Sequence, residues 1–112
     1  MYVGTLRFDL LLGEVRSLKQ KRSIVRPIVA ELRRRGSVAV AEVGHLDLYR
    51  RAMIGVAVVS ATPARCVELL DACERLVSAR PEIELLSAKQ QLRSDDDTES
   101  SQQRSFWRKE NQ

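Results

Sequence analysis

Apolar and polar side chains alternate along residues 2–12, and this pattern constrains the fold of the 112-residue chain more than any other feature. One side of the segment carries Tyr2, Gly4, Leu6, Phe8, Leu10 and Leu12. The other side carries Val3, Thr5, Arg7, Asp9 and Leu11. A period of two residues is typical of a β-strand that is buried on one face. We therefore predict a strand over residues 2–12 that ends at Gly13 and turns its first side toward the core.

The next segment has the period of an amphipathic helix. Ser17 and Gln20 have the spacing of a capping box, and Gly36 is a typical residue at the end of a helix. Pro27 removes one backbone donor, so we expect either a kink near Ser23 or an irregular first part that gives way to a regular helix. The apolar face should consist of Leu18, Val25, Ile28, Val29 and Leu32, with the aliphatic stem of Lys21 along it.

Two β-rich runs, residues 38–43 and 52–60, follow and are joined by a long hairpin connection over residues 44–51. Thr62 and Pro63 read as an N-cap and a first helical residue, and the helix they begin ends before Pro81. Residues 82–88 form a last short strand. The order βαββαβ predicts a ferredoxin-like α+β fold, a four-stranded antiparallel sheet with two helices on one face.

The length of the chain fits one small domain. We place this domain at residues 1–92, because residues 93–112 are polar and acidic without periodicity and are predicted to form a disordered tail. No apolar run approaches the roughly 18 residues that span a bilayer. The first residues lack the features of a signal peptide, so we expect a cytoplasmic protein that does not bind membranes.

Little in the sequence indicates catalysis or a cofactor. Cys66 and Cys73 are about 10.5 Å apart along the second helix, which is too far for a disulfide, and we expect both to be buried apolar residues. His45 and Asp47 form the one conceivable acid-base pair, with structural roles as the alternative. Because no catalytic motif is present, we predict no enzyme, no catalytic residue, no metal site and no cofactor.

Residues 16–35 hold most of the positive charge. They contain eight basic residues and one acidic residue, a net charge of +7 in a chain whose total is +4. Such a local patch is typical of a surface that meets a polyanion, although an ordinary solvated helix face is the alternative. The opposite face of the first strand has no aromatic residue, so we expect contacts with phosphates instead of stacked bases. The predicted nucleic-acid-binding residues are Arg16, Lys19, Arg22, Arg26, Arg33 and Arg34.

Three further interpretations stay open. The sheet face without helices is partly apolar and suits a homodimer, with Met53, Ala57 and Val59 extending it. Residues 13–19 can hold an anion at the start of the first helix, or they simply cap it. The acidic run at 95–99 can fold over the basic helix and compete with nucleic acid, while Phe106 and Trp107 dock on a partner or a groove, or residues 94–112 only aid solubility.

Three short motifs resemble those of the YlxP-like proteins, a bacterial family of unassigned function. They are Tyr2-Val3-Gly4-Thr5, Arg16-Ser17-Leu18-Lys19-Gln20-Lys21-Arg22-Ser23 and Ala41-Glu42-Val43-Gly44-His45, and the likeness extends to about residue 92. The resemblance implies a small ferredoxin-like domain without known catalytic residues. The family's genes lie among those of translation and ribosome-maturation factors, which implies an RNA-related setting.

These observations together predict a non-enzymatic protein that binds the ribosome or a structured RNA in translation or ribosome maturation. The alternative is a homodimeric interaction module or a small-anion-binding module without nucleic-acid function.

Overall fold

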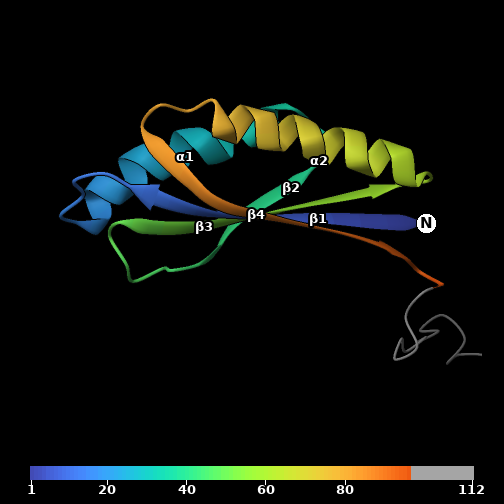
Figure 1. Ribbon diagram of the computed structural model, residues 1–112, viewed down its shortest axis with the longest axis horizontal. Helices are drawn as coiled ribbons and strands as arrows, with labels where there is room; N and C mark the ends of the chain where they lie inside the picture. Colours follow the sequence, from blue (N-terminus) through green and yellow to red (C-terminus); the bar gives the residue numbers. More distant parts are fainter. Residues whose placement is uncertain (97–112) are drawn as a thin grey trace, which may run out of the picture.

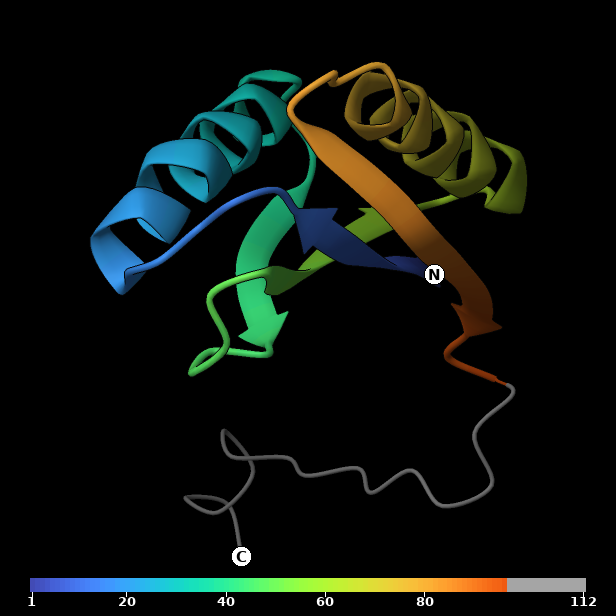
Figure 2. The same cartoon turned by 60° about the vertical axis from the view of Figure 1, so that its left-hand side comes forward.

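Two β-α-β units in succession build the fold, which the computed structural model describes for residues 1–96 (Figure 1). The elements are strand β1 (Tyr2–Leu12), helix α1 (Leu18–Arg34), strands β2 (Ala39–Gly44) and β3 (Arg51–Ser60), helix α2 (Pro63–Ser78) and strand β4 (Ile83–Ser94). The strands form one antiparallel sheet in the order β2-β3-β1-β4, with both helices on the same face (Figure 2). The predicted ferredoxin-like α+β fold is confirmed.

The hydrophobic core lies between the sheet and the two helices. Both central strands, β1 and β3, turn alternate residues into this layer, as the alternation in residues 2–12 predicts. Helix α1 packs mainly against β2, whereas α2 covers β1, β3 and β4. The largest buried residues are Leu6, Phe8, Leu10, Leu12, Ile28, Leu32, Ile54 and Leu70. Cys66 and Cys73 are also buried, on the inner face of α2.

Gly4 allows α2 to approach β1 closely. A Cβ atom at this position would lie 2.8 Å from Leu70 Cδ1 and 3.2 Å from Cys66 Cβ. Both distances are shorter than ordinary van der Waals contacts, so the Cβ of a larger residue would force Leu70 and its neighbours to shift.

Both helices begin where the sequence predicts. Ser17 Oγ accepts a hydrogen bond from Gln20 N at 3.1 Å, and Gln20 Oε1 accepts one from Arg16 N at 2.7 Å, which is a reciprocal capping arrangement. Thr62 caps α2 in the same way through Arg65 N, with Pro63 as the first helical residue. Helix α1 runs without interruption through Pro27, so the predicted irregular first part is not present.

Strand β4 is longer than predicted. The sequence predicts a strand over residues 82–88, but the structure shows one over Ile83–Ser94, paired with β1 up to the pair of Tyr2 and Ser94. The extension lies at an edge of the sheet and has few buried side chains, so its sequence needs no alternation. Backbone hydrogen bonds to β1, in place of buried side chains, stabilise this extension of β4. Arg93 and Ser94, which we assigned to the tail, therefore belong to the sheet, and residues 97–112 lie outside the described part.

The sheet face opposite the helices is not covered by any element within residues 1–96 (Figure 2). Odd-numbered residues of β1 and β3 point to this open face, including Thr5, Arg7, Asp9, Met53 and Ala57, as predicted. No helix of residues 1–96 is long and apolar enough to cross a membrane.

Candidate functional site

The predicted contact residues lie along α1 and the turn before it. Arg16 precedes the N-cap residue, and the other five belong to the helix. Positions 19, 22, 26 and 33 are three, four and seven residues apart, so they share one side of a helix with about 3.6 residues per turn. All side chains of the set are exposed. We call the five helical members, Lys19, Arg22, Arg26, Arg33 and Arg34, the basic stripe.

The first half of the basic stripe surrounds a shallow depression of about 350 Å³. Its lining consists of Lys19, Arg22 and Arg26 together with Ser23 and Pro27. Lys19, Arg22 and Arg26 form no ion pair with any residue of the described part of the chain. Three positive charges thus converge on a concave surface that is open to solvent.

Arg33 is held in place, unlike the cations at the start of the helix. Its Nη2 atom donates a hydrogen bond to the carbonyl oxygen of Val40 in β2 at 2.9 Å. This bond fixes the guanidinium group and leaves its other donors for a ligand. Arg34, the next residue, forms no ion pair within residues 1–96.

Glu31, the one acidic residue of α1, does not offset the basic stripe. It forms an ion pair with Arg80, which follows α2. Arg80 also binds Glu82 at 3.1 Å. The carboxylate of Glu31 is therefore paired on the side of the helix that faces α2, with a guanidinium group that it shares with Glu82, and the outer side of α1 carries cations alone.

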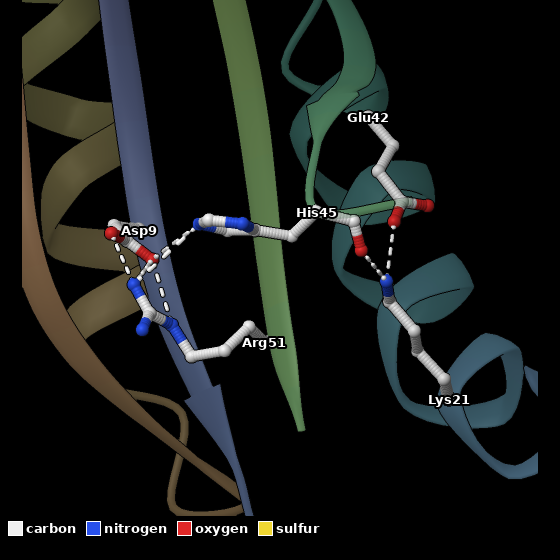
Figure 3. A network of polar contacts seen from close by, with 5 residues as sticks. All are labelled: Asp9, Lys21, Glu42, His45 and Arg51. Atoms are coloured by element: carbon white, nitrogen blue, oxygen red, sulfur yellow. Dashed lines mark hydrogen bonds and ion pairs between the residues drawn. The ribbon is translucent and has the colours of Figure 1, made fainter. Parts of the chain in front are cut away.

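Lys21 does not contribute to the surface charge, because its whole side chain is buried. We expected only its aliphatic stem to lie on the apolar face. In the structure the side chain is 3% exposed, and Nζ lies 3.0 Å from Glu42 Oε1 and 2.7 Å from the carbonyl oxygen of His45 (Figure 3). The ammonium group thus joins α1 to β2 and to the loop that follows it.

His45 extends this network to the open face of the sheet (Figure 3). Its Nε2 atom lies 3.4 Å from Asp9 Oδ1. Arg51 Nη2 donates to both carboxylate oxygens of Asp9, at 2.7 and 2.6 Å. These hydrogen bonds from Arg51 lower the pKa of Asp9, although partial burial opposes the shift. The network therefore links α1, β2, β3 and β1 around the loop between β2 and β3.

The conceivable acid-base pair of His45 and Asp47 is not formed. His45 has a left-handed backbone with a φ of 55°, so the strand ends there and residues 45 and 47 do not share a face. Asp47 is exposed, and Asp9 takes its place beside the imidazole. Alternation in residues 2–12 places Asp9 on the open face, but the sequence contains no signal for its pairing with residues 45 and 51.

The loop before α1 uses several of its own donors. Arg16 N and Gln20 N are bound within the capping arrangement, and Val15 N donates to Gly13 O at 2.8 Å. Gly13 O also accepts from Arg50 Nε at 3.0 Å. These bonds favour a capped helix over an anion site at residues 13–19.

No group of three or more metal-ligating side chains is present within residues 1–96. The predictions for the tail, its acidic run at 95–99 and its aromatic residues Phe106 and Trp107, concern residues that lie almost entirely outside the described part.

Comparisons with known proteins agree with the three motifs. A sequence 26% identical over 82 residues is the uncharacterized protein YlxP of Bacillus subtilis (strain 168), and the match covers 73% of this chain and 89% of YlxP. Among solved structures, a mutant of SnoaB, a cofactor-independent oxygenase from Streptomyces nogalater, is 11% identical with a TM-score of 0.43. That match covers 89% of this chain and 98% of SnoaB, and at this score it carries no argument about activity.

Residues 3–90 match the family described as "Protein of unknown function (DUF503)". The match spans most of the chain and ends within β4, so it includes the basic stripe and the network around His45. The chain belongs to this family of proteins of unknown function.

Proposed function

We propose that this protein binds RNA without catalysing a reaction, associating with the ribosome or another structured RNA in translation or ribosome maturation. The basic stripe and Arg16 are its contacts with phosphates. The observation that supports the proposal is the outer side of α1, where exposed cations follow one another and the one acidic residue of the helix is bound by Arg80 on another side.

The dimensions of the basic stripe suit a polyanion. From Lys19 to Arg34 the helix rises by about 22 Å at 1.5 Å per residue. This length faces several successive phosphates of a nucleic acid strand, whereas a single small anion would use only part of it. Each phosphate neutralised by a cation releases counterions, so the affinity should fall steeply with salt.

The open face of the sheet does not offer a platform for stacked bases. Within residues 1–96 the aromatic residues of β1, Tyr2 and Phe8, point to the core side. Proteins that recognise single-stranded RNA on such a sheet stack bases on exposed aromatic side chains. Recognition through phosphates and the shape of a folded RNA is therefore the mode that fits this surface.

A homodimeric interaction module is the second candidate function, because the sheet face opposite the helices is partly apolar and not covered by any element within residues 1–96. The predicted homodimer stays a prediction. Charge reversal on α1 separates the two candidates, because it should abolish RNA binding and leave dimerisation through the sheet unchanged.

The test is cosedimentation of the protein with ribosomal particles from its own cell extract, at low and high salt. We expect comigration with one particle at low salt that is lost at high salt and in Arg22→Glu/Arg33→Glu/Arg34→Glu. Log affinity falls as log salt concentration rises, and each phosphate contact removed should make this negative slope less steep by roughly 0.7–0.9.

A matched control reverses three exposed cations elsewhere, in Arg65→Glu/Arg75→Glu/Arg93→Glu. This variant has the same net charge as the α1 variant and should still comigrate. Migration at the top of the gradient in every condition, or equal loss in both variants, would contradict the proposal.

A further inference from the structure

The open face of the sheet holds a shallow groove of about 440 Å³. Small apolar residues of β2 and β3 form much of its floor, among them Ala39, Ala41 and Ala57. Arg7 of β1 and Lys89 of β4 also line it. The groove therefore combines an apolar surface with two cations.

The pairing register of β1 and β4 places these two cations side by side, with no acidic partner in the described part of the chain. Arg7 and Lys89 are direct partners in the antiparallel pairing of β1 with β4, so their side chains lie side by side on the open face. Neither forms an ion pair within residues 1–96, and Asp9, the next open-face residue of β1, is bound by Arg51. Like charges at directly opposed positions destabilise a sheet, and an acidic occupant of the groove would relieve this repulsion.

We infer that residues 97–112 of the same chain occupy this groove. The segment has three acidic and three basic residues, but they are unevenly placed: Asp97 and Glu99 precede the first cation, Arg104, and the aromatic pair follows it. Of these acids, Glu99 pairs with Lys89 and Arg7. Seven residues after Glu99, Phe106 and its neighbour Trp107 cover the apolar floor over β2 and β3.

The point where the described chain ends favours this occupant. Asp95 N donates to the carbonyl oxygen of Met1 at 3.1 Å, so the chain leaves the sheet beside the start of β1. Lys89 is five residues before Ser94, about 17 Å along the strand. Glu99 is five residues after Ser94 and can reach back about as far when extended, and Phe106, ten residues after Asp96, can span up to about 33 Å. The segment is therefore long enough to turn back over the groove within one molecule.

A second copy as the occupant of the groove, and the basic stripe as the location of the segment, both fit less well. A second copy packed face to face would bring Arg7 and Lys89 near the same cations of its partner, which opposes association. The basic stripe lies on α1, which packs against β2 at the far edge of the sheet from β4, where the chain emerges. The groove is the nearer cationic surface, and its occupation leaves the basic stripe free.

Trp107 is the one tryptophan of the chain, so its fluorescence reports the position of the segment directly. We would record the emission maximum and acrylamide quenching of the full chain, at a concentration where sedimentation equilibrium shows a monomer. The reference is a peptide of residues 97–112. We expect a blue-shifted maximum and a severalfold lower quenching constant in the full chain.

Three variants locate the binding surface. Ala57→Glu places a carboxylate in the apolar floor, and Arg7→Glu/Lys89→Glu reverses the two cations at exposed positions. Both should restore the emission and quenching of the free peptide. Arg22→Glu/Arg26→Glu reverses two cations of the basic stripe and is the matched control, which should keep Trp107 shielded. If circular dichroism shows that Ala57→Glu does not fold, the Arg7→Glu/Lys89→Glu variant decides alone.

Several results would overturn the inference. One is emission and quenching equal to those of the free peptide in the unaltered monomer. Another is release of Trp107 by the control variant, which would place the segment on α1, or shielding that neither groove variant changes. Shielding that develops only at concentrations where the protein dimerises would assign the groove to a second copy.

Discussion

Loss of the Glu42 carboxylate should destabilise the protein more than loss of the Lys21 ammonium, because the two groups differ in burial. The Lys21 side chain is 3% exposed, whereas that of Glu42 is 29% exposed. In Glu42→Gln the ammonium stays buried without a counter-charge. In Lys21→Met the remaining carboxylate still reaches water, and the methionine fills most of the space of the lysine stem.

The expected magnitudes follow from this asymmetry. Removing one partner of a buried ion pair costs about 3–5 kcal/mol, and the lower end applies to Glu42→Gln because the amide oxygen still accepts from Lys21. For Lys21→Met we expect about 1.5 kcal/mol, the lower end for a hydrogen bond of a charged group. At about 4–8 °C per kcal/mol, the melting temperature should fall by about 12–24 °C and about 6–12 °C, respectively.

Urea and thermal unfolding followed by circular dichroism measure both variants. The double variant Lys21→Met/Glu42→Gln completes a thermodynamic cycle and should be more stable than Glu42→Gln alone, since no unpaired ammonium is left in the core. A Lys21→Met variant that is the less stable single variant, or a double variant with strictly additive losses, would refute the reasoning.

Three further predictions concern other parts of the structure. Asp9 has a lowered pKa in the folded protein. Its ionised form therefore stabilises the fold above pH 3.8, its pKa in the unfolded chain, and this stability is lost as the pH falls through the lower folded pKa. Urea unfolding at pH 7 and pH 3 should show a smaller acid-induced loss of stability in Asp9→Asn than in the unaltered protein. Gly4→Ala should lower the free energy of unfolding by about 1–3 kcal/mol, because the added Cβ lies 2.8 Å from Leu70 Cδ1. In Gly13→Ala the added Cβ meets nothing within 4 Å, so the free energy of unfolding should change little. Burial raises the pKa of the Cys73 thiol, so iodoacetamide should label this residue only after unfolding, and rapid labelling of the native protein would contradict the burial.

The basic stripe could be predicted from the sequence because exposure on a helix follows from its period. Once the apolar positions fix which side of α1 faces the core, the cations at positions 19, 22, 26, 33 and 34 must point outward. The role of Lys21 could not be predicted in the same way. Its position on the apolar side was evident, but its partners lie 21 and 24 residues further along the chain.

The length of β4 shows a second limit of sequence patterns. A strand that is buried on one face must alternate, so its pattern identifies it. The second half of β4 lies at an edge with little burial, and its hydrogen bonds to β1 do not depend on which side chains it carries. Its extent was therefore fixed by the length of the neighbouring strand.

The sequence by itself determined the order of the elements, the core faces of β1, α1 and α2, the caps of both helices and the outward position of the basic stripe. All of these depend on residues that are close in sequence, where backbone geometry fixes relative positions. Only the tertiary structure decided that Lys21 binds Glu42, that His45 faces Asp9 instead of Asp47, and that Arg7 lies beside Lys89. These contacts depend on strand register and loop conformation, which the packing of the whole domain selects.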